Sequence, residues 1–507
     1  MAEEAIQETP SITQLAETTL SDARNTFRDG ITRPFAWRIT QVQALKNMID
    51  EHEADICASL FDDLGKSSFE ANYSELDPLR NTCDYFLKNI KKLMKPTSAA
   101  LPWYMQSSAK ATITPEPLGV VLVFSAWNFP LLLALDPLVA AVAAGNVVVL
   151  KPAELAKSTC TILKQLLPQY LDPRAVKVFE ATRQECAMLL ELKFDKIFYT
   201  GSPRIGRIIM EAAAKHLTPV TLELGGKNPV IVDSTADIFV VARRLAATKW
   251  VINSGQTCIA PDYVLVHSDV MSLFLEALKE ALISFVTPLP PHESAYADEE
   301  PTDPQEQCFP HIINAESFAR LQRLLEEVKD NINFTLGQAA EETLMIMPTI
   351  VVNPPPDCGL MQEEIFGPIL LVLEVESTES AIDFVNSRPQ PLALYLFTSN
   401  EELGKEVAQR TSSGSVVVND VGVQFNVESF PFGGVGESGM GSYHGKFGFH
   451  TFSHMKPLLV TKTHGDDPTR YPPYTKKSKA ILRACLRNQS ILTVLLIKFG
   501  FKKPSKF

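Results

Sequence analysis

Apolar and polar positions follow two different periods along this chain. From residue 11 to about 95, apolar residues recur every three or four positions, as at Ile49, Ile56 and Leu60, which predicts helices. A Lys-Pro-Thr-Ser break ends this region. The stretch from Ala99 to Pro117 is expected to be irregular or to form a short strand.

From Gly119 the pattern changes to compact apolar runs separated by segments of helical length. The first set of runs lies at 119–125, 146–150, 175–179, 196–200 and 219–224, and the second set lies at 228–233, 263–267, 369–375, 392–397 and 414–420. Strands that alternate with helices favour parallel sheets covered on both faces. We therefore expect an α/β protein with two doubly wound, Rossmann-like domains.

Composition and charge exclude several classes of protein. The chain has 507 residues, with 47 basic and 59 acidic side chains, and the net charge of −12 gives no electrostatic footprint for nucleic acid. Its eight cysteines are scattered, which favours a reducing, cytosol-facing compartment. The acidic, polar start is unlike a secretory signal, and no apolar run is long enough for an ordinary transmembrane helix.

Two segments depart from the rest of the chain in composition. Residues 287–310 are rich in proline and acidic residues, which predicts a mobile inserted loop. Residues 468–507 carry ten Lys and Arg residues and no Asp or Glu. This asymmetry suggests an appended tail with its own partner.

Cys258 is the first candidate for chemistry. It follows Asn-Ser-Gly-Gln-Thr, a polar turn that can present a thiol and a backbone N–H to a substrate. A cysteine is more often a small structural side chain, so the turn alone is only suggestive. Glu223 is the second candidate, since it ends an apolar strand before two glycines, where α/β sheets place their ligands. A capping or salt-bridged glutamate is the alternative.

Two further motifs could bind a nucleotide. Gly201, Ser202 and Gly206 lie between a strand and a helix, where free N–H groups can hold a phosphate. Lys151 and Glu154 follow a strand and could hold a ribose, although a surface ion pair is the commoner case. The triplet Gly-Lys-Ser at 65–67 is not a P-loop because it lacks the upstream glycine. The nine histidines show no metal-ligand spacing, so no metal site is expected.

Together these motifs resemble those of the aldehyde dehydrogenase superfamily. The motifs WNFP, KPAE, TGSPRIG, LELGGK, NSGQTC, EEIFGP and PFGG occur in the family's order over residues 20–460. The finer resemblance is to the class 3 and fatty aldehyde dehydrogenase branch, through segments such as NSGQTCIAPDY and PFGGVGESGMGSYHGK.

The resemblance implies a role for each matching residue. Cys258 corresponds to the nucleophile, Glu223 to the general base and Asn128 to the oxyanion-hole amide. Glu364 is a second candidate for the base. The residues implied to bind the cofactor are Lys151, Glu154, Gly201, Ser202, Gly206, Glu364 and Phe366, and His444 is implied to lie near the substrate end.

The resemblance also implies a domain plan. Residues 1–96 and 120–223 are expected to form the NAD-binding domain and 224–415 the catalytic domain. Segments 97–119 and 416–465 are expected to form a small bridging and oligomerisation element, and 466–507 a basic amphipathic tail. Glu154 favours NAD over NADP, because a carboxylate repels a 2′-phosphate. The turn Glu-Ala-Thr-Arg at 180–183 departs from the branch beside the cofactor.

The implied activity is NAD(P)-dependent oxidation of hydrophobic aldehydes to acids, by a homodimer. Long-chain aldehydes come first, with an apocarotenoid or another apolar or aromatic aldehyde as the alternative. A non-catalytic protein and a thiol esterase on the same fold remain as rivals. The tail mixes basic and apolar residues, which suits peripheral contact with an anionic membrane facing the cytosol.

Overall fold

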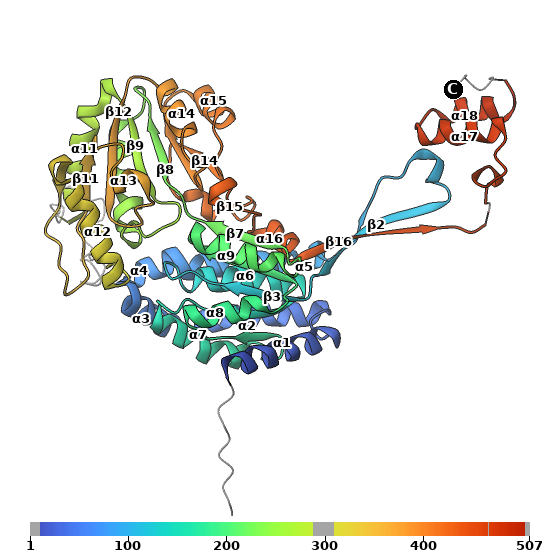
Figure 1. The fold of residues 1–507 in the computed structure, drawn as a ribbon, viewed down its shortest axis with the longest axis horizontal. Coiled ribbons are helices and arrows are strands. Elements are labelled where there is room, and N and C mark those ends of the chain that lie inside the picture. The colour runs from blue at the N-terminus through green and yellow to red at the C-terminus, as the bar shows by residue number, and fades with distance from the viewer. Residues whose placement is uncertain (1–10, 287–308, 465, 502–507) are drawn as a thin grey trace, which may run out of the picture. The chain divides into compact units, whose positions relative to one another are not determined.

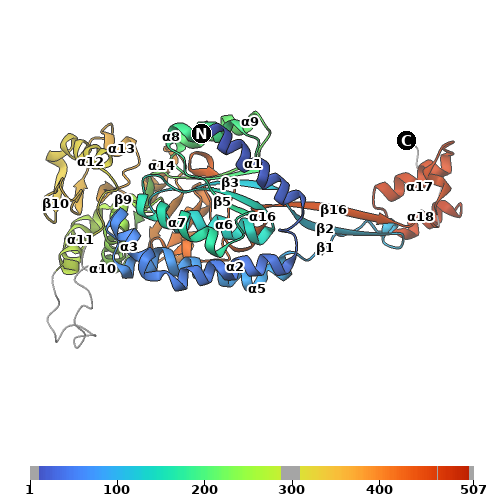
Figure 2. The same ribbon diagram turned by 90° about the horizontal axis from the view of Figure 1, so that it is seen from below.

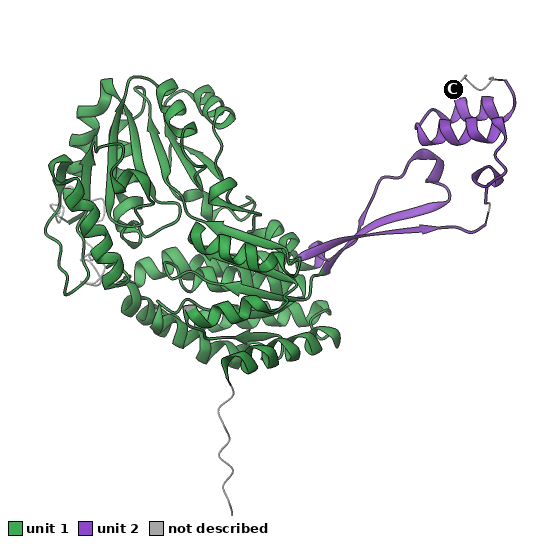
Figure 3. Cartoon of the chain, viewed as in Figure 1, with its two compact units in different colours: residues 1–90, 117–452 green, residues 91–116, 453–507 purple. Residues whose placement is uncertain are grey.

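The computed structural model describes residues 11–286, 309–464 and 466–501. The chain divides into two compact units (Figure 3). Unit 1 comprises residues 1–90 and 117–452, and unit 2 comprises residues 91–116 and 453–507. The predicted loop at 287–310 falls, apart from its last two residues, outside the described residues.

The first sheet of unit 1 has six strands in the order β15-β7-β6-β3-β4-β5. All of its strands run parallel except the short β15. The strands are β3 (Val120–Phe124), β4 (Val147–Lys151), β5 (Val176–Val178), β6 (Lys196–Gly201), β7 (Val220–Leu224) and β15 (Gly439–Met440). The chain order reverses between β3 and β6, so ligands are expected near the carboxyl ends of these strands.

Helices cover both faces of this sheet. Figure 2 shows α1, α8 and α9 on one face and α6 and α7 on the other, with α2 packed on the side of α6 and α7 that is away from the sheet. The bounds are α1 (Ile12–Arg28), α2 (Phe35–Glu51), α6 (Leu132–Ala144), α7 (Lys157–Tyr170), α8 (Arg183–Glu191) and α9 (Pro203–Ala214). Every residue of α6 is buried, which explains its almost uniformly apolar sequence.

The helical pattern of residues 11–95 is confirmed. After α1 and α2 come α3 (Glu53–Leu64), α4 (Ser68–Ala71), the π-helical turn η1 (Asn72–Leu76) and α5 (Asp77–Leu93). Gly65 ends α3 in the left-handed conformation, and the Ser67 side chain caps α4. This tight connection holds Lys66 between two helix ends.

The second sheet of unit 1 has seven strands in the order β10-β11-β12-β9-β8-β13-β14. Only the pair β10–β11 is antiparallel. The strands are β8 (Asn228–Val232), β9 (Pro261–His267), β10 (Ile332–Thr335), β11 (Thr349–Val352), β12 (Ile369–Val375), β13 (Ala393–Phe397) and β14 (Ser415–Val418). The predicted fold class, two doubly wound α/β sheets, is therefore confirmed.

Helices also flank the second sheet (Figure 1). They are α10 (Ile238–Ala246), α11 (Met271–Val286), α12 (Ala315–Glu327), α13 (Gly359–Gln362), α14 (Thr378–Asn386) and α15 (Glu401–Arg410). Buried side chains of α12, α13, α14 and α15 pack on strand residues in one core cluster. Helix α10 ends at Ala246 and continues as a π-helical turn, η3 (Ala247–Val251).

Unit 2 contains a three-stranded sheet in the order β1-β2-β16 and two helices. The elements are β1 (Thr97–Ser98), β2 (Ala109–Pro117), β16 (Ser453–Thr461), α17 (Lys476–Leu486) and α18 (Ile491–Lys498). In α17 and α18, buried residues such as Ile481 and Val494 form a small core, against which Trp103 packs. In the described part of the chain, no helix has the length and apolarity to cross a bilayer.

One expectation differs from the structure. Residues 109–117 form a nine-residue strand, because β16 pairs beside them, a long-range partner that local sequence does not reveal. In unit 1, β15 pairs with β7 and α16 (Gly445–Thr451) packs on α6.

Candidate active site

The turn before Cys258 has an unusual backbone. Asn253, Ser254 and Gly255 have φ values of 49°, 47° and 72°, in the left-handed region. Holding a non-glycine residue there costs about 1–3 kcal/mol, so the surroundings must impose the conformation. At Gly255 an added Cβ would lie 2.5 Å from the Gly367 carbonyl oxygen, so only glycine fits.

Buried amide side chains hold this turn in place. The Gln256 Nε2 atom donates to the carbonyl oxygens of Asn253 at 3.2 Å and His311 at 2.9 Å. Its Oε1 atom accepts from the Ile313 N–H at 3.1 Å. Asn228, which begins β8, donates Nδ2 to the Cys258 carbonyl oxygen at 2.8 Å. The position of Cys258 is thus fixed by the rigid strand end and the turn itself.

Cys258 is a free, half-buried thiol. Desolvation, together with the negative charges of Glu364 and Glu223, raises the pKa of Cys258 to about 12. The electrostatic effect of both carboxylates shows that they lie within reach of the thiol. A thiol in this setting is protonated at neutral pH, so its attack on a carbonyl carbon needs a base.

Glu223 occupies the carboxyl end of β7 and is only 3% exposed. Neither carboxylate oxygen has a hydrogen-bond partner among the described residues. Burial raises the pKa of Glu223 well above its usual value. A buried carboxyl group left unpartnered is costly for folding, and groups with such perturbed pKa values concentrate at functional sites.

Asn128 lies in the turn between β3 and α6 and is 3% exposed. Its Nδ2 atom donates to the Gln256 carbonyl oxygen at 3.1 Å, and its own carbonyl oxygen accepts from Asn253 Nδ2 at 2.7 Å. These two bonds join a turn of the first sheet to the turn that carries Cys258. The structure therefore brings Cys258, Glu223 and Asn128 into one site.

The candidate cofactor residues of the first sheet lie at strand ends beside the reversal of chain order. Lys151 ends β4 and forms an ion pair with Glu154. Gly201 ends β6, and the Ser202 side chain caps α9. An added Cβ at Gly201 would meet the Tyr199 hydroxyl oxygen at 2.2 Å, and one at Gly206 would meet Leu224 at 2.8 Å.

These features fit a dinucleotide. Lys151 and Glu154 offer a donor and an acceptor for ribose hydroxyls, and Glu154 is exposed enough to reach a ligand. The turn at Gly201 opens a 12-residue helix, whose N-terminus favours a phosphate.

Glu364 and Phe366 come from the second sheet. The Oε1 atom of Glu364 accepts from the Gly226 N–H at 3.1 Å. An added Cβ at Gly225 would clash with the Glu364 carboxylate, which explains the glycine at this position. Desolvation, reinforced by the charge of Asp262, raises the pKa of Glu364 to about 8. Phe366 packs edge-on against Trp127, with ring centroids 5.3 Å apart.

His444 lies in a buried aromatic cluster. Its ring stacks on Phe432 at 5.1 Å and contacts Phe425 and Tyr443. Its Nε2 atom is 3.3 Å from Asp136 Oδ2 of α6. The negative charges of Cys258 and Glu223 contribute to raising the pKa of the neighbouring Tyr443, so this cluster adjoins the site.

The turn at 180–183, whose sequence departs from the one usual in this branch, is held by local contacts. Glu180 forms an ion pair with Lys164 of α7 at 2.5 Å. Thr182 caps α8 and shares a capping box with Glu185. This sequence therefore replaces the usual branch turn with a capped helix start.

Sequence reasoning missed the charged residues behind Asn128. Lys66, Glu70 and Glu75 are all buried. Lys66 belongs to the Gly-Lys-Ser triplet at 65–67, which does not match the P-loop motif. The missed signal is that one lysine, just before a helical segment, and two glutamates within that segment follow one another at spacings of four and five residues and are all buried.

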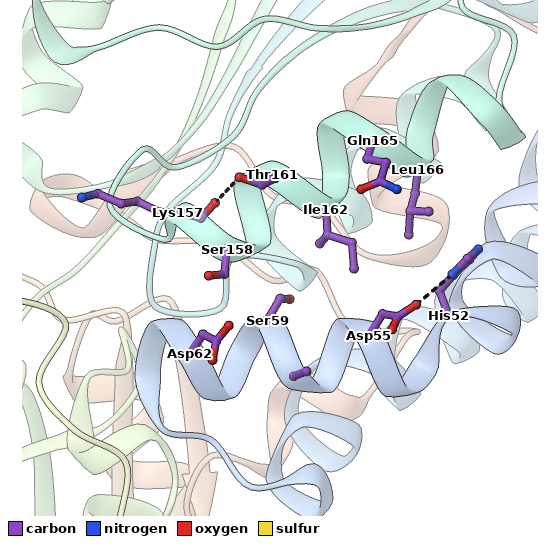
Figure 4. A pocket seen from close by; sticks show the side chains of 11 residues that line it. His52, Asp55, Ser59, Asp62, Lys157, Ser158, Thr161, Ile162, Gln165 and Leu166 are labelled. Carbon is purple, nitrogen blue, oxygen red and sulfur yellow. Dashed lines mark hydrogen bonds and ion pairs between the residues drawn. The ribbon is translucent and has the colours of Figure 1, made fainter.

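A surface groove lies apart from these residues. It has a volume of about 580 Å³ and runs between α3 and α7. Figure 4 shows His52, Asp55 and Ser59 facing Thr161 and Gln165 across it. It includes none of the candidate site residues.

Comparison with known proteins identifies the family. The aldehyde dehydrogenase family profile matches residues 2–458. The chain therefore belongs to the aldehyde dehydrogenase family and is an NAD(P)-dependent oxidoreductase that acts on aldehydes. The sequence resemblance is confirmed, including its class 3 branch, because similar curated proteins from a plant and a mammal are named as family 3 members.

Two curated relatives cover nearly the whole chain. Aldehyde dehydrogenase family 3 member H1 of Arabidopsis thaliana is 46% identical over 487 residues, covering 96% of this chain and 97% of that protein. Aldehyde dehydrogenase family 3 member A2 of Rattus norvegicus is 44% identical over 454 residues, covering 89% and 90%.

Solved structures share the fold. AldH of Staphylococcus aureus, in a substrate-bound state, matches with a TM-score of 0.87 and 36% identity, covering 93% of this chain and 99% of that one. Glyceraldehyde-3-phosphate dehydrogenase GapN of Methanocaldococcus jannaschii, complexed with NADP, matches with a TM-score of 0.78 at 22% identity, covering 90% and 97%. The second likeness concerns the fold alone.

Proposed function

We propose that this enzyme oxidises hydrophobic aldehydes to carboxylic acids, with Cys258 as nucleophile, Glu223 as general base and Asn128 in the oxyanion hole. The observation that carries this assignment is the buried, unpartnered carboxylate of Glu223 within electrostatic reach of the Cys258 thiol. A purely structural glutamate would have an ion-pair or hydrogen-bond partner, because burial without one is unfavourable.

The residues divide the chemistry among them. Glu223 or Glu364 takes the thiol proton, and the Cys258 sulfur forms a bond to the aldehyde carbon. The Asn128 amide and the Cys258 N–H stabilise the negative charge that develops on the oxygen. When bound, NAD(P)⁺ would supply the acceptor for the hydride that leaves this carbon, so that the Cys258 adduct becomes a thioester. After any thiol proton it holds has passed to solvent, Glu223 removes a proton from water, which attacks the thioester and releases the acid and the Cys258 thiolate.

The cofactor would be held by residues of the first sheet. Lys151 and Glu154 would bind the adenosine ribose, and the turn at Gly201 would face the phosphates. We infer a preference for NAD⁺, because the Glu154 carboxylate would repel a 2′-phosphate.

A hydrophobic substrate is supported by the apolar neighbours of the proposed reacting groups. In the sequence, Trp127 and Phe129 flank Asn128 and Ile259 follows Cys258, and in the structure Phe366 packs on Trp127. Apolar surroundings favour an apolar chain and leave few polar groups to reward a small polar aldehyde.

The first test is NADH or NADPH formation over an aldehyde panel of acetaldehyde, benzaldehyde, hexanal, hexadecanal and a long polyene aldehyde. We expect kcat/KM to rise with apolar chain length, to be higher with NAD⁺ than with NADP⁺, and to vanish in Cys258→Ala. The matched control is Cys358→Ala, which removes another half-buried free cysteine that lies outside the site. Highest kcat/KM for acetaldehyde would contradict the hydrophobic assignment.

The pH dependence tests the role of Glu223. Its raised pKa means that the carboxyl group is protonated at low pH and becomes a base only as pH rises through that value. We therefore expect the hydrolysis rate to increase with pH well above about 4.3, the usual value for glutamate. Glu223→Gln should lose about 10²–10⁴-fold in kcat. A variant that keeps the wild-type rate and pH profile would exclude Glu223 as the base.

We infer that the C-terminal tail binds an anionic membrane surface. Exposed apolar side chains of the tail include Leu492 of α18, at 62%, and Phe499, which directly follows α18, at 67%. Lys498 lies in the last turn of α18, next to Phe499. A segment that combines exposed apolar residues with cations has the composition that inserts at a lipid headgroup layer.

Flotation with liposomes tests this contact. Wild-type protein should float with vesicles that contain phosphatidylserine, and less so with neutral vesicles or at high salt. The double variant Leu492→Glu/Phe499→Glu should lose most of this binding, whereas Leu217→Glu, at a residue 90% exposed in unit 1, should not. Equal flotation of all three proteins would disprove the role of the tail.

We also propose that two chains associate through β16. This strand is at the edge of its sheet, and Leu458, Leu459 and Val460 on it are more than half exposed. An exposed apolar edge strand is suited to pairing with a second copy. Light scattering should give twice the chain mass of 56.1 kDa, and half of that value for Leu458→Lys/Val460→Lys. A monomeric wild type would refute the pairing.

A further inference from the structure

Lys66 carries an ammonium group in the interior of unit 1. Its side chain and that of Glu75 are both 0% exposed, and Lys66 Nζ lies 2.7 Å from Glu75 Oε1. Burying two ions costs several kcal/mol for each ion, and their attraction offsets this cost only when further hydrogen bonds satisfy both partners. The further hydrogen-bond partners of Lys66 and Glu75 therefore show which segment of the chain the ion pair fixes in place.

All the further partners belong to one short segment, 128–132. Lys66 Nζ donates to the Asn128 carbonyl oxygen at 2.9 Å and lies 4.0 Å from the centre of the Phe129 ring. Glu75 Oε2 accepts from the N–H groups of Leu131 at 2.9 Å and Leu132 at 3.0 Å. The ion pair thus holds both ends of the turn that presents the Asn128 amide.

The same helical segment reaches the turn that carries the nucleophile. Glu70 Oε1 accepts from the Asn253 N–H at 2.6 Å, and Asn253 Nδ2 shares with Lys66 the Asn128 carbonyl oxygen as acceptor. The charges of Lys66 and Glu75 also act on Glu70. Both catalytic turns are therefore held by one buried charged cluster from outside the two sheets.

We propose that Lys66 and Glu75 are positioning residues for aldehyde oxidation, fixing the Asn128 amide where the oxyanion forms. This inference rests on the proposed role of Asn128. Loss of the Lys66 ammonium removes a charge-assisted hydrogen bond from the Asn128 carbonyl and frees the turn to shift. A displacement of about 1 Å at such a group can cost about 10²-fold in rate.

A double-mutant cycle on the full-length enzyme tests this proposal. The variants are Lys66→Met, Asn128→Ala and the two combined, and the readout is the single-turnover rate of NADH formation with hexanal. We expect Lys66→Met to slow this step about 10–100-fold and Asn128→Ala about 10²–10³-fold. The combined variant should be no slower than Asn128→Ala, because Lys66 acts through Asn128.

Controls separate positioning from a general effect on folding. Lys46→Met, which removes the partly exposed ion pair with Asp84, should keep the wild-type rate. The Kd for NAD⁺ should change less than about twofold in Lys66→Met. If that variant does not fold, Lys66→Met/Glu75→Gln removes both charges together, and the cycle is measured with it.

Two results would overturn the proposal in distinguishable ways. An equal slowing by Lys66→Met in the wild-type and Asn128→Ala backgrounds would show that Lys66 does not act through Asn128. A wild-type rate in Asn128→Ala alone would refute the oxyanion role itself, and the positioning role with it. Rescue of the rate by Lys66→Arg, which keeps the charge, would support the proposal.

Discussion

The hydrogen bond from Asn253 Nδ2 to the Asn128 carbonyl oxygen, 2.7 Å long, joins the two halves of the active site. One partner belongs to a turn at the carboxyl end of the first sheet, and the other precedes β9 of the second. Because the second turn is strained, it keeps its shape only while such contacts oppose its relaxation. The mutual placement of the thiol, the carboxylate and the amide depends on this junction.

The electrostatics of the site follow from the same packing. The packing of the two turns buries Glu223 and shields Cys258 and Glu364 from much of the solvent, and each group then favours its neutral form. The paired glycines after Glu223 allow Glu364 to approach this cluster.

Much of this arrangement could be predicted from the sequence, for a physical reason. The strands of both sheets are buried runs, and short motifs at their ends, such as those around Lys151 and Cys258, carry local information about the turns. Strand β16 was not predicted, because its exposed residues and Pro457 give no alternating pattern. The role proposed for Lys66 could not be predicted from the sequence either, since its partners Glu75 and Asn128 meet it only after folding.

The central claim is that aldehyde carbon becomes bonded to Cys258 and that Glu223 releases it. Intact mass spectrometry of Glu223→Gln, mixed with hexanal and NAD⁺, tests it most directly. The account predicts that each chain gains one hexanoyl group, located by digestion at Cys258. An unmodified chain that still produces NADH, or an acyl group on another residue, would contradict the account.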